Sequence, residues 1–292
     1  MALFASEALF TDGLLPLSLL AEVSMTAEPL VPFFGWLTNS VFVAAVVTLL
    51  LLWAARKATR QLRPVPSGFQ NFFEFVIEFL YSQVEQIVGP KVAPKCFPLL
   101  ATLFLFIVIS NWFGLVPGVG TIGFGHLKGP LTLDTSQHYT PLLRPATADL
   151  NMTLGMAAVF MITWAWITYR EVGVIGFIKH TFGPKGGLTG ILAALLVPIF
   201  LFVGVIELIS IAFRPVSLSM RLFGNIYAGE SLLHTMGSML DNAHPVIAFL
   251  GSVLLPLPFY FMELLVGVLQ AMVFALLCAV YIQLSTSHEE DH

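Results

Sequence analysis

The segment around Arg221, SMRLFGNIYAGE, places a permanently charged side chain in one of the most apolar parts of the chain. Between residues 187 and 236 the formal charges are Glu207, Arg214, Arg221 and Glu230. A guanidinium stays protonated at any relevant pH, and moving one into hydrocarbon costs about 3 to over 10 kcal/mol. Such a residue persists where it pairs with another group or acts on one. Ion movement is therefore the leading hypothesis.

Helical spacing places these charges relative to one another. Glu207, Arg214 and Arg221 are seven residues apart, so two helical turns bring them to nearly the same face. Asn225 lies one turn beyond Arg221 on that face. Glu230 is nine residues from Arg221, which places it on the opposite side of the helix.

The final apolar segment has a similar polar stripe, formed by Glu263, Gln270 and Tyr281. A stripe with a central arginine would therefore face one with a central glutamine, and Glu230 and Glu263 would line a second region. This pattern predicts two polar paths, one leading to each side of the membrane, with the arginine between them. The alternative is that such charges only lock helices together as ion pairs.

Composition defines the class of protein. The chain of 292 residues is 57% hydrophobic and only 10% charged, whereas soluble domains carry roughly 25% charged residues. Its apolar runs are longer than the roughly 18 residues that indicate a membrane helix, and no alternating barrel pattern is present. We predict an all-α integral membrane protein. Cys96 and Cys278 give no disulfide framework.

Three apolar runs predict membrane spans, at about residues 36–55, 97–116 and 152–169. The first is followed at once by Arg56, Lys57, Arg60 and Arg63, which favours a cytoplasmic location for that end. The next segment, GFQNFFEFVIEFLYSQVEQIVG, mixes apolar and acidic residues at helical spacing. It predicts an amphipathic helix at the membrane interface.

The last two apolar segments, at residues 188–236 and 245–287, are longer than one perpendicular crossing needs. A helix over the second would extend for about 60 Å, against a hydrocarbon core of about 30 Å. Each segment either folds back as a hairpin or forms one long, steeply tilted helix. We favour two tilted helices, because an odd total of about five crossings agrees with the charge bias.

Several motifs carry a resemblance to a known family. The runs RPVSLSMRLFGNIYAGE and MELLVGVLQAMVFALLCAVYIQLS closely resemble subunit a of the rotary, F-type ATP synthases. PSGFQNFFEFVIEF, SNWFGLVPG, RPATADLNMTLGMA and KHTFGP fit upstream in the same order. The resemblance covers roughly residues 36–287.

The resemblance implies a proton-conducting stator subunit, with Arg221 as the essential charge facing a rotating ring of c subunits. Each c subunit carries one membrane-embedded carboxylate. Asn225 and Gln270 match positions that flank this arginine. Glu230 and Glu263 match a coupled polar pair assigned to the periplasmic inlet half-channel, where some members carry a histidine and this chain has two glutamates.

The resemblance also assigns an acid of the cytoplasmic path to Glu207. It gives four secondary candidates: Tyr281, Arg214, Asn111 and Asn151. The resemblance implies a non-catalytic subunit. No Walker motif is present, so the nucleotide chemistry of such a complex would belong to other chains. The implied partners are the c ring, the peripheral-stalk b subunits, other ATP synthase subunits and lipid. No cofactor, metal or nucleic acid is expected.

We divide the chain into an extracytoplasmic or interfacial segment (1–35), one membrane domain (36–287) and a cytoplasmic acidic tail (288–292). We expect a multi-pass protein of the bacterial inner membrane, rather than an organelle inner membrane, with a periplasmic N-terminus and a cytoplasmic C-terminus. The GxGxxG pattern at 118–123 follows a membrane helix and not a strand, so it predicts a loop. The loop at 118–148 could cover the inlet path as a lid.

Three other functions would leave different features in the sequence. A secondary transporter would use similar buried charges but should contain internal repeats, and the halves of this chain show none. An intramembrane protease would need a nucleophile and a base, and Ser231 and His234 have no supporting motif. A purely structural membrane subunit would not need the stripe of charged residues.

Overall fold

The computed structural model describes residues 38–60, 66, 68–116, 123–125, 139–141, 144–182, 191–240 and 244–286. The predicted segment 1–35, the acidic tail 288–292 and most of the 118–148 loop, with all but the last residue of its GxGxxG pattern, lie outside these residues. The predictions made for them stay predictions.

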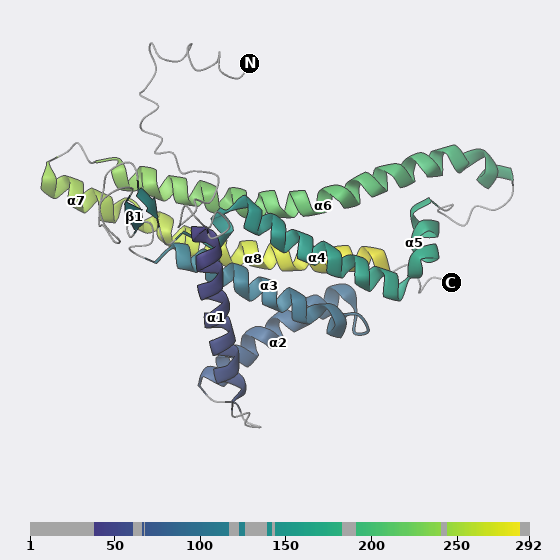
Figure 1. Cartoon of the computed structure of the whole chain (residues 1–292), viewed down its shortest axis with the longest axis horizontal. Helices are drawn as coiled ribbons and strands as arrows, with labels where there is room; N and C mark the ends of the chain where they lie inside the picture. The colour runs from purple at the N-terminus through teal and green to yellow at the C-terminus, as the bar shows by residue number, and fades with distance from the viewer. Residues whose placement is uncertain are drawn as a thin grey trace, which may run out of the picture.

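Helices make up nearly all of the described chain. They are α1 Asn39–Thr59, α2 Phe69–Val88, α3 Ala93–Gly114, α4 Leu150–Glu171, α5 Gly173–Phe182, α6 Ile191–Ser238, α7 Pro245–Leu254 and α8 Leu257–Thr286 (Figure 1). A short ladder joins β1 Gly123–Gly125 to β2 Tyr139–Pro141, and a 3-10 turn, η3, covers Ala146–Ala148.

Five helical segments of the described chain are long and apolar enough to cross a membrane. They are Asn39–Thr59, Ala93–Gly114, Leu150–Glu171, Val197–Gly237 and Phe249–Thr286. The prediction of an all-α integral membrane protein with about five crossings is confirmed.

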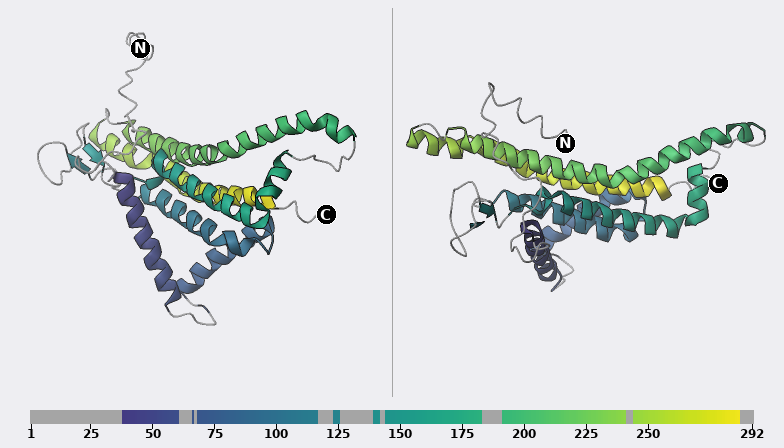
Figure 2. Two further views of the ribbon diagram at one scale, coloured as in Figure 1. Left: turned by 45° about the vertical axis from the view of Figure 1, so that its right-hand side comes forward. Right: turned by 45° about the horizontal axis from the view of Figure 1, so that its top comes forward.

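The long helices form one layered bundle (Figure 1). α6 runs along α8 and α4, and α3 packs against α8 on the other side. α1 leaves the bundle at a steep angle, and α2 returns from its far end toward α3. In both views of Figure 2 the first half of α6 diverges from the bundle. This leaves one long flank of α6 without a neighbour in the described part of the chain.

The α2 helix confirms the amphipathic segment expected from the sequence. Gly68 and Gly89 bound it with φ values of 60° and 80°, backbone angles that L-residues with a side chain rarely adopt. Its buried residues Leu80, Val84 and Val88 join the core of α3 and α8. Its opposite side exposes four phenylalanines: Phe69, Phe72, Phe75 and Phe79. Its place at the membrane interface stays a prediction.

Neither of the two long segments folds back as a hairpin, but the second contains a break. α6 is one helix of 48 residues with Pro198 and Pro215 inside it, and it would extend for about 70 Å. The last segment is interrupted at Leu255 and Pro256, where α7 ends and α8 begins. Proline lacks the N–H that a continuous helix needs, so Pro256 contributes to the break, although α6 accommodates two prolines. A length of 70 Å requires tilt in a 30 Å hydrocarbon core.

The core lies where α3, α4, α6 and α8 meet. Its largest fully buried side chains include Ile107, Phe160, Leu222 and Phe274, one from each of these helices. On α8 the buried positions are mostly small, as at Ala271, Ala275, Cys278 and Ala279. Small residues let helix backbones approach closely in membranes. This close packing fixes the polar side chains of α6 and α8 relative to one another.

Candidate functional site

Arg221 is exposed on α6, a helix whose other large exposed side chains are mostly apolar. Met220, the preceding residue, is 51% exposed. Within the described residues, Arg221 has no hydrogen-bond, ion-pair or ring partner. A cation on an apolar helix surface is costly in lipid. Arg221 is thus a charge without a counter-charge in the described part of the chain.

Asn225, one turn beyond Arg221, joins α6 to α8. Its Nδ2 donates a hydrogen bond of 2.7 Å to Oε1 of Gln270, which is only 5% exposed. The sequence placed these residues on facing polar stripes, and the structure brings them together. The bond anchors the backbone of α6 beside Arg221 against α8.

A second contact between the stripes lies eleven residues away on each helix. The guanidinium of Arg214 lies 4.6 Å from the ring centroid of Tyr281 on α8 and 5.7 Å from that of Trp164 on α4. Trp164 Nε1 also donates to the Tyr281 carbonyl at 3.0 Å. The two contacts between the stripes define how α6 and α8 pair along their length. If the same pairing continues to Arg221, the residue opposite it on α8 is the buried Phe274. Arg221 therefore has no polar counterpart on α8, whereas Arg214 is held by aromatic rings.

Glu207 and Arg214 lie two turns apart along α6, on nearly the same face. Both side chains are partly exposed. Together with Tyr281 they form a polar group at the end of α8 that leads to the C-terminus. Glu230 and Glu263 lie beyond Arg221, toward the opposite end of the bundle.

Glu263 occupies a space that Gly229 leaves open. It is 8% exposed, and a Cβ added at Gly229 would overlap its carboxyl group. Within the described residues no cation pairs with Glu263. The Glu263 carboxyl is thus held close to the backbone of α6 at Gly229, the residue just before Glu230.

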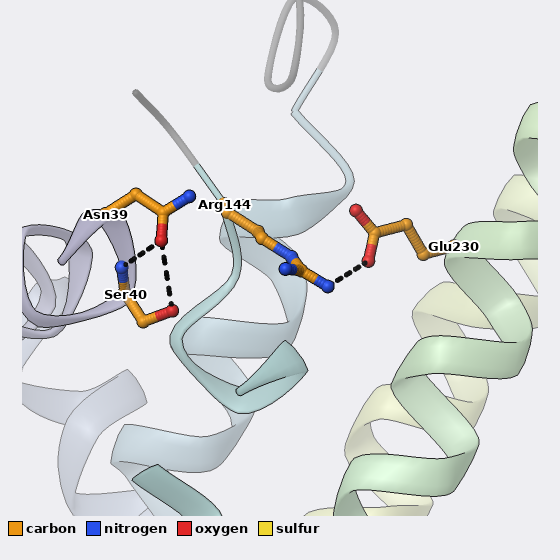
Figure 3. A network of polar contacts seen from close by, with 4 residues as sticks. All are labelled: Asn39, Ser40, Arg144 and Glu230. Atoms are coloured by element: carbon orange, nitrogen blue, oxygen red, sulfur yellow. Dashed lines mark hydrogen bonds and ion pairs between the residues drawn. The ribbon is translucent and has the colours of Figure 1, made fainter. Parts of the chain in front are cut away.

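Glu230 faces Arg144, a residue that the sequence analysis did not single out (Figure 3). Arg144 is 4% exposed and lies just before η3, with its NH2 atom 3.7 Å from Oε2 of Glu230. A signal was present in the sequence. Arg144 is a lone arginine beside a span, on the side opposite the basic clusters, where arginine is uncommon.

Asn111 fixes α3 and η3 to α8 near the acids. It accepts a hydrogen bond of 2.7 Å from Oγ1 of Thr147, and its Nδ2 donates to the Gly267 carbonyl at 3.1 Å. Trp112 Nε1 donates to the Leu264 carbonyl, also at 3.1 Å. Both carbonyls lie within about one turn of Glu263. Asn151 is not part of this group: it is exposed in the first turn of α4, where its backbone N–H is capped by Asp149 at 3.0 Å.

Replacing Asn111 by leucine should lower the free energy of unfolding by about 1–3 kcal/mol, because it leaves the buried Thr147 hydroxyl without its acceptor. Titration of the purified chain with denaturing detergent, followed by tryptophan fluorescence, would measure this. Thr102→Val is the control, because Thr102 is exposed and bonds only to its own helix. Equal midpoints for the parent and Asn111→Leu would contradict the structural role given to Asn111.

The fold and these polar side chains define a multi-pass membrane protein with ionisable groups inside membrane-length helices, an arrangement that marks ion pathways. The sequence matches the family described as "ATP synthase A chain" over residues 37–283. It is 35% identical over 248 residues to an ATP synthase subunit a of Pelobacter propionicus, covering 85% of this chain and 86% of that one.

Two further relatives agree. The ATP synthase subunit a of Gloeobacter violaceus is 32% identical, with 85% of this chain and 83% of the relative covered. The subunit a of Trichlorobacter lovleyi is also 32% identical, with 95% of this chain and 99% of the relative covered. The chain belongs to the ATP synthase subunit a family. It is therefore an ion-translocating membrane subunit that works with other ATP synthase subunits.

Proposed function

We propose that the chain is the proton-conducting stator subunit of its complex, in which Arg221 faces a rotating ring of c subunits. The observation that carries this proposal is the position of Arg221. It is exposed on an apolar flank of α6 and lacks a partner within the described chain. A ring carboxylate would supply the missing counter-charge.

The chemistry follows from charge and solvation. A protonated carboxyl group can rotate through lipid, whereas a carboxylate cannot do so cheaply. Beside the fixed guanidinium the charged form is favoured, so the ring carboxyl releases its proton there. The same positive charge repels a proton that would cross directly from one path to the other. Arg221 thus acts as a release trigger and as a seal.

The two paths are offset along α6. Glu230 lies nine residues after Arg221 and Glu207 fourteen before it, or about 14 and 21 Å along a straight helix. Glu230 and Glu263 would form the inlet half-channel, and Glu207, Arg214 and Tyr281 the outlet. Asn225 and Gln270 would orient the region around Arg221. Asn111 supports the inlet by holding α8, and we keep Asn151 only as a surface candidate.

Topology and location are part of this proposal. Arg56, Lys57 and Arg60 at the end of α1, and Arg170 at the end of α4, favour the cytoplasm for these ends. The N-terminus is then periplasmic, the C-terminus is cytoplasmic, and residues 36–287 form one domain in the bacterial inner membrane. The b subunits are the remaining expected partners, and nucleotide chemistry takes place on other chains.

The inlet can be tested with Glu263→Gln in the whole complex. Without its carboxyl, proton passage at this position should slow, and ATP-driven acidification of inverted vesicles should fall about a hundredfold, the lower end of the range for one positioned proton-transfer group. Glu78→Gln, which changes an exposed acid on α2, should pump like the parent. Undiminished pumping by an assembled Glu263→Gln complex would remove Glu263 from the path.

A further inference from the structure

Arg144 is a buried cation that is paired with an acid on α6, from a segment outside the helices. Only 4% of it is exposed, and Oε2 of Glu230 lies 3.7 Å from its NH2 atom. A buried charge is tolerated when an opposite charge compensates its lost hydration. The pairing joins the segment before η3 to α6 across 86 residues of sequence.

The spacing of the pair suits a carboxylate that must still exchange a proton. At 3.7 Å the contact is longer than a hydrogen bond, and Oε2 of Glu230 has no hydrogen-bond partner in the described part of the chain. The Glu230 side chain is 33% exposed. Arg144 can therefore attract and orient the carboxylate without occupying its lone pairs.

The backbone on which Arg144 lies is held from several sides. Pro145 packs so closely on Gly114 that a Cβ there would overlap its ring. Thr147 bonds to Asn111, and Ala146 is fully buried against Val43 and Val47 of α1. Figure 3 shows the arginine extending from this segment toward α6. Its charge is thus held at a fixed place relative to Glu230.

We propose that Arg144 is a positioning residue of the inlet half-channel, holding the Glu230 carboxylate by Coulomb attraction in the orientation from which it passes protons. This inference rests on the proposed function. It separates two roles within one chain: Arg221 acts on the ring, and Arg144 acts on the carrier that supplies it. Arg144 stays charged and does not pass protons itself.

A double-mutant cycle with Arg144→Met and Glu230→Gln tests the proposal in the intact complex. ATP-driven acidification is measured in inverted vesicles, and assembly by copurification of the chain with the ring. Arg144→Met should reduce pumping about tenfold. If this loss arises only through Glu230, it equals the coupling between the two residues, and its size is within the usual range for groups in contact. The double variant should pump no worse than Glu230→Gln alone, and Arg144→Lys should retain more than half of the parent rate.

The pair formed by Lys95 and Glu171 is the matched control, because its atoms lie 2.5 Å apart but its side chains are 48% and 28% exposed. Lys95→Met and Glu171→Gln should each pump within about twofold of the parent, as is usual for surface pairs. A cycle on this pair should show no coupling.

Three results would overturn the proposal: full pumping by Arg144→Met, effects of the two changes that multiply in the double variant, or an Arg144→Lys complex that assembles but pumps as poorly as Arg144→Met. If Arg144→Met does not assemble, the exchange R144E with E230R decides. Recovery of assembly relative to R144E alone supports the charge pairing, and no recovery of assembly refutes it.

The cycle also separates this proposal from the proposed function. Full pumping by Glu230→Gln would remove the carrier that Arg144 is proposed to position, and would leave the role of Arg221 open to its own test. Full pumping by Arg221→Ala would refute the stator mechanism whatever the cycle shows.

Discussion

Replacing Arg221 by alanine is expected to abolish ATP-driven acidification while the complex remains assembled. Without the guanidinium, a ring carboxyl must ionise on an apolar helix surface with no fixed counter-charge. One opposite charge at about 4 Å is worth roughly 4 kcal/mol near a protein surface, which corresponds to about a thousandfold in rate. The measurement is the initial rate of acidification in inverted vesicles, with copurification of the ring as the check on assembly.

Two further variants isolate the role of the charge. Arg221→Lys keeps a positive charge but loses the planar, rigid fork of donors, so it should pump at a rate between the parent and Arg221→Ala. Arg170→Ala is the control, because Arg170 is an exposed arginine stacked on Trp166 of the same helix, 4.4 Å from its ring centroid. If an assembled Arg221→Ala complex pumps like the parent, the arginine is structural and the mechanism fails.

The seal predicted for Arg221 has a separate measurement. In vesicles holding a preformed proton gradient, the Arg221→Ala complex should let the gradient decay faster than the parent does in the absence of ATP, because no fixed charge then repels protons between the two paths. Arg170→Ala should decay at the parental rate. If the proton gradient decays equally fast with the parent, Arg221→Ala and Arg170→Ala complexes, Arg221 acts only in proton release and not as a seal.

The spans could be predicted from sequence because a membrane imposes one simple requirement on each segment. An apolar run near 20 residues that satisfies its own backbone hydrogen bonds is a helix, and α1, α3 and α4 agree with this within a few residues at each end. The break between α7 and α8 was harder to place. Pro198 and Pro215 are accommodated inside α6, whereas Pro256 lies at a break, so proline alone does not decide the outcome.

Contacts along facing helices could also be predicted, since they follow from helical periodicity. Asn225 and Gln270 were placed on facing stripes and do bond to one another. The direction of the Arg214 side chain was not foreseen. It lies nearly on the face of Arg221, yet its guanidinium is held by Tyr281 and Trp164, because aromatic rings from two neighbouring helices happen to lie within its reach.

Arg144 could not be assigned from periodicity, because it belongs to no helix. Its pairing with Glu230 depends on how η3 packs between α1, α3, α4 and α6, a tertiary arrangement that a single sequence does not encode in any local pattern. The space that Gly229 leaves for Glu263 has the same origin. A glycine in an apolar helix has many uses, and only the position of α8 shows which one applies here.

Gly229→Val is expected to reduce ATP-driven acidification by about a hundredfold, the size of loss that a displacement of roughly 1 Å can cause at a reacting group. The added side chain would take the space of the Glu263 carboxyl and move it away from α6. Assembly should persist, because the atoms displaced are the end of a flexible side chain and not backbone. Acidification by inverted vesicles and copurification of the ring would measure both effects.

Gly237→Val provides the matched control, since Gly237 lies two turns further along α6 and a Cβ there would meet nothing within 4 Å. It carries the same cost of a branched residue in a helix, about half a kcal/mol or more relative to alanine, but leaves Glu263 in place. It should therefore pump close to the parental rate. If Gly229→Val assembles and also pumps like the parent, the position of the Glu263 carboxyl against α6 does not limit proton flow. The inlet half-channel would then have to run through Glu230 alone.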